Sequence, residues 1–291
     1  MFLTGCGKAA RKRRDRLATV MIASLAGFVL LVLASLMTYI FVQGVSAVSW
    51  EFLSEFPRHA MTEGGIFPAI VGTVYLAVGS MCISVPLGFG AAIYLAEYAK
   101  PGALVSAVRL GVANLAGVPS VVFGLFGLSL FVTTFGFGRS LLSGCLTLGL
   151  LTLPTVTAAA EEAIRQTPAS FREAALALGA SRWQAVRQVI LPAALPGMLT
   201  GGILALGRAA GETAPISLTS ATAYSPALPD SPFNEAMALT THIYNLATNG
   251  SDIAATRPQQ FGTSLVLVTL VLGLSLFALV IRARLRRSRR W

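Results

Sequence analysis

The sequence predicts an all-α, polytopic membrane protein with six transmembrane helices. Its 291 residues are 55% hydrophobic and 12% charged, with a mean hydropathy of +0.72, whereas ordinary soluble domains carry about twice that share of charge. The charges are grouped so that six charge-poor stretches remain, each long enough to cross a bilayer as a helix. The expected helix cores are 18–42, 68–95, 116–135, 141–160, 196–220 and 262–281.

The order of charge and hydropathy divides the chain into four parts. A basic N-terminus covers 1–17, and the first transmembrane helix with an outer amphipathic segment covers 18–65. One compact bundle follows over 66–282, and a basic tail covers 283–291. No internal repeat and no low-complexity linker interrupts the bundle, so we expect a single membrane domain.

The outer amphipathic segment, 43–65, follows the first helix. In it Trp50 and Phe52 alternate with Glu51 and Glu55. This pattern predicts a short helix at the membrane interface, with Trp50 at the level of the lipid headgroups.

The distribution of Lys and Arg predicts the orientation. With the N-terminus inside, eighteen of the 22 cationic residues fall in cytoplasmic segments, three fall outside, and Arg208 lies within the bilayer. The sequence therefore predicts a multi-pass protein of the bacterial plasma (inner) membrane with both termini in the cytoplasm. The net charge of +10 then reflects topology and contact with membrane lipids, and it indicates no nucleic-acid partner.

The third span is rich in glycine and contains a proline. Its sequence around Pro119 and Ser120 is NLAGVPSVVFGLFG. Small residues allow close contact between helices, and the proline removes a backbone donor. We expect a helix kink at Pro119 and Ser120, facing neighbouring helices or a cavity.

The fifth span contains the only two charges between Arg187 and Asp230, namely Arg208 and Glu212. A spacing of four residues predicts that both side chains lie on one helical face, near the middle of the span. A charge at that depth costs at least ~2.5 kcal/mol on insertion scales, so it needs a partner and a protein or water environment.

Two interpretations of these charges remain open. They are either a structural ion pair that locks two helices together, or part of a polar site on a solute pathway, which is the default for intramembrane ionisable groups. In the second case Thr213 adds a hydroxyl, and two glycines thin the helix so that a partner helix or a solute can approach. The predicted substrate-pathway residues are Arg208, Glu212, Thr213, Gly207 and Gly211.

The loop 161–192 predicts a pair of helices between two spans. Thr167 precedes a proline and suits an N-cap, and Gly179 suits a left-handed C-terminal cap. Ser181 begins a capping box, and Pro192 is expected to end the second helix. Such a pair could bind DNA, lie on the bilayer surface, or act as coupling helices that present a small-residue face, Ala174, Ala175 and Ala177, to another protein. Its short tethers to the membrane disfavour DNA, and the alanine face favours coupling.

The same loop resembles the EAA signature of ABC importer permeases, which reads EAA, three residues, Gly, nine residues and I-x-L-P. Here it stands as Glu173-Ala174-Ala175, Gly179 and Val189-Ile190-Leu191-Pro192, with Val in place of the first Ile. The stretches 114–127 and 207–215 resemble phosphate importer permeases. The string GETAPI favours the A-type (PstA) family over the C-type.

This resemblance implies the type I ABC importer (MetI-like) permease fold over 66–282, with ATPase coupling through the loop. The coupling residues it implies are Glu173, Ala174, Ala175, Gly179, Leu191 and Pro192. It also implies a heterodimer with a C-type phosphate permease, two copies of a cytoplasmic ATPase, and a periplasmic or extracellular phosphate-binding protein.

The implied function is phosphate import by a subunit that is not itself an enzyme. The chain lacks the phosphate-binding string G-x-x-x-x-G-K-[ST], so we expect no cofactor here, with ATP and Mg²⁺ handled by the partner ATPase. Nothing indicates a metal site.

Three alternative functions remain. The chain could belong to an importer of another oxyanion, such as sulfate, molybdate or phosphonate. It could be an ion-driven secondary anion transporter, but the paired halves with interrupted helices that are typical of that class are not visible. It could also be a membrane scaffold, which leaves the Arg208/Glu212 pair unexplained.

Overall fold

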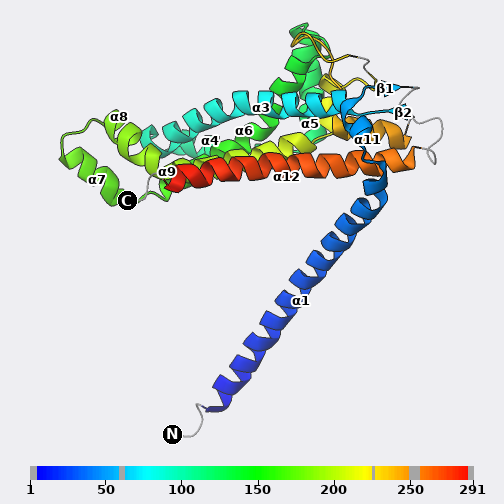
Figure 1. The fold of residues 1–291 in the computed structure, drawn as a ribbon. Helices are drawn as coiled ribbons and strands as arrows, with labels where there is room; N and C mark the ends of the chain where they lie inside the picture. Colours follow the sequence, from blue (N-terminus) through cyan, green and yellow to red (C-terminus); the bar gives the residue numbers. More distant parts are fainter. Residues whose placement is uncertain (1–4, 59–62, 225–226, 249–255, 288–291) are drawn as a thin grey trace.

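The computed structural model describes residues 5–58, 63–224, 227–248 and 256–287, and it is almost entirely helical (Figure 1). Among these described residues, five helices are long and apolar enough to cross a membrane, and a bent helix pair raises the candidates to six. The predicted all-α, polytopic fold class is confirmed.

Three helices form the centre of the bundle. They are α3 (Phe67–Ile93), continued by the π-helical segment η3 (Tyr94–Tyr98), α6 (Leu141–Arg165) and α9 (Leu191–Gly211). Small residues bring them close: a Cβ at Gly88 would lie 2.7 Å from Val156, and one at Gly197 would lie 2.7 Å from Ala163. Such contacts let helix backbones approach without large side chains between them.

The third span is broken. Helix α4 (Ala103–Ala116) is followed by α5 (Ser120–Gly127), which continues into the π-helical segment η4 (Leu128–Thr134). The two parts are bent by 101°, and Pro119, which has no N–H to donate, precedes the first turn of α5. The expected kink at Pro119 and Ser120 corresponds to this bend, but the expected core 116–135 is not one continuous helix.

Two ends of the bundle can be told apart in Figure 1. One, the hairpin end, holds α2 (Trp50–Ser54), the antiparallel pair β1 (Pro57–Arg58) and β2 (Glu63–Gly64), and α11 (Leu239–Thr248). The other, the α7 end, holds α7 (Ala169–Ala177) and α8 (Arg182–Ala185).

The expected interfacial helix in 43–65 is present only as the short helix α2, after the 3₁₀ turn η1 (Val45–Ala47). Ser49 caps it by accepting the N–H of Phe52 at 3.0 Å. Phe52 is buried against the bundle, whereas Trp50 is exposed together with Glu51, so the two aromatic residues do not share one face.

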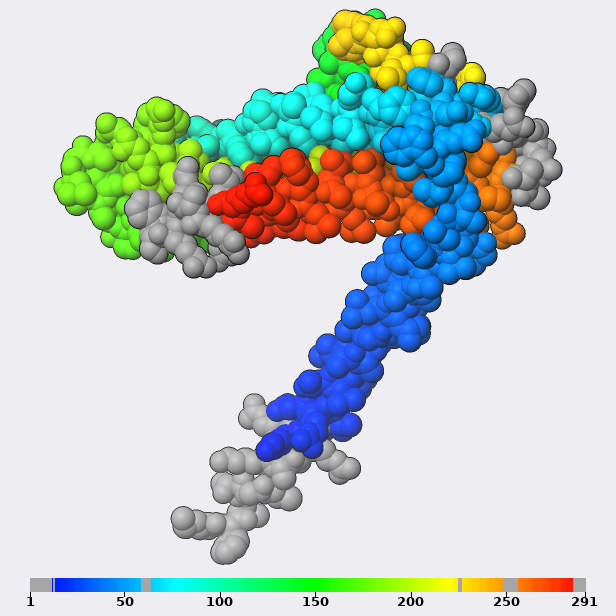
Figure 2. Space-filling model, viewed as in Figure 1, coloured from blue at the N-terminus to red at the C-terminus, as the bar shows by residue number. Residues whose placement is uncertain are grey.

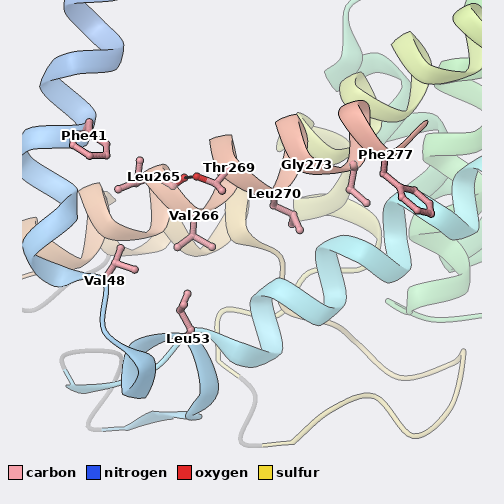
Figure 3. Close-up of a pocket in the computed structure, with 10 residues that line it drawn as sticks. Phe41, Val48, Leu53, Leu265, Val266, Thr269, Leu270, Gly273 and Phe277 are labelled. Carbon is pink, nitrogen blue, oxygen red and sulfur yellow. Dashed lines mark hydrogen bonds between the residues drawn. The ribbon is translucent and has the colours of Figure 1, made fainter. Parts of the chain in front are cut away.

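Helix α1 (Gly5–Gly44) stands away from the bundle and meets α12 (Arg257–Arg287) only near its own C-terminal end (Figure 2). There Tyr39 and Phe261 pack edge to face at 5.4 Å between ring centroids. A groove of about 560 Å³ lies between these helices, and Phe41, Leu53 and Phe277 are among its lining residues (Figure 3). Its described lining carries no charged group, so it offers nothing to bind an anion.

The second half of the 161–192 loop differs from the prediction. Pro192 does not end a helix, because α8, the π-helical segment η5 (Val186–Ile190) and α9 form one continuous helix of 30 residues, Arg182–Gly211. The π turn changes the hydrogen-bond register just before the proline, with Leu191 donating to Val186 O. The proline is therefore tolerated where a regular α-helix would break.

Candidate functional site

Helix α9 ends at the charged pair instead of continuing to residue 220. Gly211 is its last residue, and Glu212 adopts an extended conformation with φ −73° and ψ 143°. The short helix α10 (Ala214–Thr219) then begins with a proline in its first turn. The prediction that Arg208 and Glu212 share one face of a continuous helix is therefore wrong, because the second residue lies beyond the helix end.

The two charges nevertheless form an ion pair. Arg208 Nε donates to Glu212 Oε1 at 3.2 Å, and the side chains are 36% and 14% exposed. Within the described residues, the terminal nitrogens of this guanidinium make no other hydrogen bond. A cation in the last turn also interacts favourably with the helix dipole. Thus Nε of the guanidinium is bonded to Glu212, and its two terminal nitrogens remain able to donate to another group.

Neighbouring helices hold the break in place. Thr240 Oγ1, on α11, donates to Glu212 O at 2.8 Å. The adjacent N–H of Leu239 donates to Thr73 Oγ1, on α3, at 2.9 Å. Both threonines are buried. The sequence analysis missed them, since hydroxyls of this kind carry no signal until the helices are assembled.

The pair lies off the centre of the bundle. A Cβ at Gly202 would lie 3.8 Å from Val85, which is near the midpoint of the helix Phe67–Tyr98. Arg208 is six residues further along α9, or about 9 Å nearer the hairpin end at 1.5 Å per residue. The expected position near the middle of the span is therefore shifted toward one end.

The remaining predicted pathway residues have different surroundings. A Cβ at Gly211 would meet nothing within 4 Å, whereas one at Gly207 would lie 3.6 Å from Ser275 Oγ of α12. Thr213 precedes α10, and its carbonyl accepts the hydroxyl of Ser217 at 3.0 Å. Gly211 therefore leaves open space beside the ion pair, while Gly207 faces another helix of the same chain.

A polar cavity lies toward the hairpin end. It measures about 220 Å³ and is lined by Arg139, Glu235 and Thr241, among others. Arg139 Nε lies 3.7 Å from Glu235 Oε1, and its terminal nitrogen donates to Ser217 O at 3.2 Å. These contacts connect the cavity to α10, one turn beyond Thr213.

The predicted coupling residues divide into exposed and buried sets. Glu173, Ala174 and Gly179 are exposed, but Ala175 is buried against its own chain, at variance with an outward alanine face. Leu191 and Pro192 are half-buried in the continuous helix.

The caps of this region agree with the sequence in two of three cases. Gly179 is left-handed with φ +84°, and Ala180 N–H bonds Ala175 O at 3.1 Å, which closes a Schellman motif. Ser181 forms the expected capping box. The Thr167 N-cap is wrong, because Pro168 occupies that position and no side chain caps the helix.

Within the described residues, no group of three or more His, Cys, Asp or Glu side chains could hold a metal ion. His242 on α11 is buried, and burial lowers its pKa to about 4. Its Nδ1 has no hydrogen-bond partner among the described residues, so the imidazole is neutral near pH 7.

Comparison with known proteins gives consistent matches. A family model described as "Binding-protein-dependent transport system inner membrane component" matches residues 84–291. The probable ABC transporter permease protein YqgI of Bacillus subtilis is 36% identical, covering 92% of this chain and 95% of that protein. The phosphate transport system permease protein PstA of Mycobacterium leprae is 34% identical, covering 94% of this chain and 90% of that protein.

Solved structures share the fold. A bacterial alginate ABC transporter matches with a TM-score of 0.66 and 18% identity, covering 91% of this chain and 93% of that chain. The MetNI methionine ABC transporter in an inward-facing conformation matches with a TM-score of 0.58 and 21% identity, covering 76% and 94%.

Proposed function

The chain belongs to the family of binding-protein-dependent transport system inner membrane components, and on that premise we propose that it carries inorganic phosphate across the membrane. It is a permease subunit of an ABC transporter, as its relatives are. The observation that supports phosphate best is the half-open guanidinium of Arg208.

An anion needs a cation that binds it without trapping it. Arg208 meets this need, because its terminal nitrogens are free among the described residues while Nε is held by Glu212. A planar guanidinium can bond two phosphate oxygens at once. When phosphate is absent, Glu212 balances the charge, and when phosphate leaves, the carboxylate competes for the arginine and speeds release.

Glu212 also offers a reason to favour phosphate over sulfate. Near neutral pH phosphate keeps a proton and can donate an O–H to a carboxylate, which accepts hydrogen bonds but donates none. Sulfate has no such proton and would meet Glu212 as a like charge. An Arg and a Glu side by side therefore suit a protonated oxyanion.

The other subunits supply energy and substrate. We infer that the α7 end faces the cytoplasm with both termini, in agreement with the positive charge counted there, and that exposed Glu173, Ala174 and Gly179 contact the ATPase. ATP and Mg²⁺ are then used by two copies of that subunit. A C-type phosphate permease forms the heterodimer, and a phosphate-binding protein delivers substrate at the hairpin end.

The test is uptake of radiolabelled phosphate by the assembled transporter in proteoliposomes. Arg208→Gln should lower the uptake rate at least ~100-fold, or ~2.7 kcal/mol, while the subunits still copurify. Arg58→Gln is the matched control, since it removes an arginine from an exposed ion pair with Glu55 at the hairpin end.

Wild-type uptake by the Arg208→Gln variant would refute the pathway assignment. Sulfate or molybdate that competes with phosphate at equal concentration would instead identify a general oxyanion importer.

A further inference from the structure

An ion pair between a half-exposed arginine and a buried carboxylate joins α7 to the end of α3. Arg172 Nε donates to Glu97 Oε2 at 2.9 Å, and a terminal nitrogen of the same guanidinium bonds Glu97 Oε1. The Glu97 side chain is only 6% exposed, and that of Arg172 is 34% exposed. Both carboxylate oxygens are thus bonded by one arginine, the arrangement with the most strictly defined geometry.

Glu97 lies in the π-helical segment η3, which is a meeting point for several helices. Arg109 of α4 donates to Leu95 O of the same segment at 2.8 Å and to Glu161 of α6 at 2.8 Å. Arg165 also contacts Glu161, at 3.1 Å. The end of α3 is therefore fixed to α4, α6 and α7 by charged groups.

No other hydrogen bond or ion pair between α7 and α3 exists among the described residues. Replacing a buried ion pair by apolar residues is often neutral or stabilising, so stability alone is a weak reason for such a pair. A bidentate pair does fix the position and direction of one helix relative to another. Here that means the helix α7 relative to the helix α3.

The opposite end of α3 reaches the substrate site. Thr73, 24 residues before Glu97 and thus about 36 Å away along the helix, accepts the N–H of Leu239. The next residue, Thr240, donates to Glu212 O. One continuous helix, which contains Pro86, therefore has specific polar contacts with α7 at one end and with the segment that holds Glu212 at the other.

We propose that the Glu97–Arg172 pair is a coupling link that makes α3 move with α7, so that movement of α7 reaches the Arg208–Glu212 site. This inference rests on the proposed function, in which α7 contacts the ATPase. Glu97 and Arg172 are positioning residues, since neither touches the substrate.

The functional test is the number of phosphate ions taken up per ATP hydrolysed by the whole transporter in proteoliposomes. Glu97→Gln and Arg172→Gln should each lower this ratio at least ~5-fold, while the ATPase still copurifies and hydrolyses ATP. The double variant Glu97→Arg with Arg172→Glu should return it to within ~2-fold of wild type. Arg182→Gln is the matched control, because Arg182 lines a cavity of about 240 Å³ together with Glu97 and Arg172 and has no ion pair among the described residues.

A wild-type ratio in Glu97→Gln would overturn the link, as would an equal loss in Arg182→Gln. A swapped variant that stays as defective as the single ones would also count against it. Wild-type transporter that takes up no phosphate would overturn the proposed function instead, so a second readout that needs no phosphate accompanies the first.

The second readout is the distance between spin labels at Leu178, which follows α7, and Val78 of α3, both exposed, in a chain whose three cysteines are replaced. If α7 and α3 move as one body, ATP with vanadate leaves this distance unchanged in wild type and changes or broadens it in Glu97→Gln. A change in wild type equal to that in the variant would contradict the link.

Discussion

Two of the arginine–glutamate pairs of this permease, Arg208–Glu212 and Arg172–Glu97, differ in how many hydrogen bonds join their side chains. Arg208 bonds Glu212 through one nitrogen at 3.2 Å, whereas Arg172 bonds both oxygens of a nearly inaccessible Glu97. A half-open pair can exchange its partner for an anion, and a closed pair transmits position. On the proposals above, the same two residue types serve anion binding in one region and mechanical coupling in the other.

The largest expected difference between the pairs is in stability. Arg172→Met leaves the buried Glu97 carboxylate without a partner and should cost about 3–5 kcal/mol. Arg208→Met should cost about 1 kcal/mol, because it removes a single 3.2 Å bond from a carboxylate that is 14% exposed. Thermal unfolding of the two purified variants in the same detergent measures this, and equal shifts in Tm would remove the distinction.

Lowering the pH should reduce the folding stability of the protein through His242, which lies on α11 two residues after Thr240. Burial lowers the His242 pKa from 6.5 to about 4, so the unfolded chain binds a proton between these values and the folded chain does not. Stability should fall by ~3 kcal/mol as pH drops through that window. A His242→Gln variant should lose most of this dependence, as measured by Tm from pH 7 to pH 4.

At the α7 end, Gly179→Val should strain a left-handed residue by about 1–2 kcal/mol. We expect weaker copurification of the ATPase with the membrane helices intact. Gly102→Val is the control, since this glycine precedes α4 with an extended φ of 179° and needs no left-handed conformation. Normal ATPase recovery and normal phosphate-dependent hydrolysis in Gly179→Val would argue against ATPase contact there.

The smallest effect should come from the hydroxyl that holds Glu212. Thr240→Val removes one hydrogen bond, worth about 1 kcal/mol, and should lower phosphate uptake about 5-fold. Thr241→Val, on the neighbouring residue, is the control, because its hydroxyl bonds only a carbonyl of its own segment. Equal effects of both changes would mean that the helix α11 matters and the Glu212 contact does not.

Interactions between residues close in the sequence could be predicted from the sequence, and those between distant residues could not. Arg208 and Glu212 are four residues apart, so their pairing was visible, and the caps at Gly179 and Ser181 depend on neighbours within a few residues. Glu97 and Arg172 are separated by 75 positions. Neither charge was singled out from the sequence, because their pairing depends on how the helices assemble.

The predicted helix boundaries were wrong at positions where the surrounding structure overrides the preference of a single residue. Pro192 was expected to stop a helix. A π turn before it changes the backbone hydrogen-bond register, so the helix continues although the proline has no N–H to donate. Glu212 was expected inside a helix, although Gly211 before it and Pro215 after it are signals of a break. Arg208 was placed near the middle of the span because the length of the apolar segment included α10.

Phosphate uptake by two charge-swapped transporters, measured side by side in proteoliposomes, tests the difference between the pairs most directly. The swap Glu97→Arg with Arg172→Glu should restore uptake to within ~2-fold of wild type, because a mechanical link needs only opposite charges. The swap Arg208→Glu with Glu212→Arg should leave uptake at least ~100-fold below wild type, because it moves the cation from the anion site. Restored uptake in the second swap would show that Arg208 and Glu212 are a structural pair and would contradict the anion site.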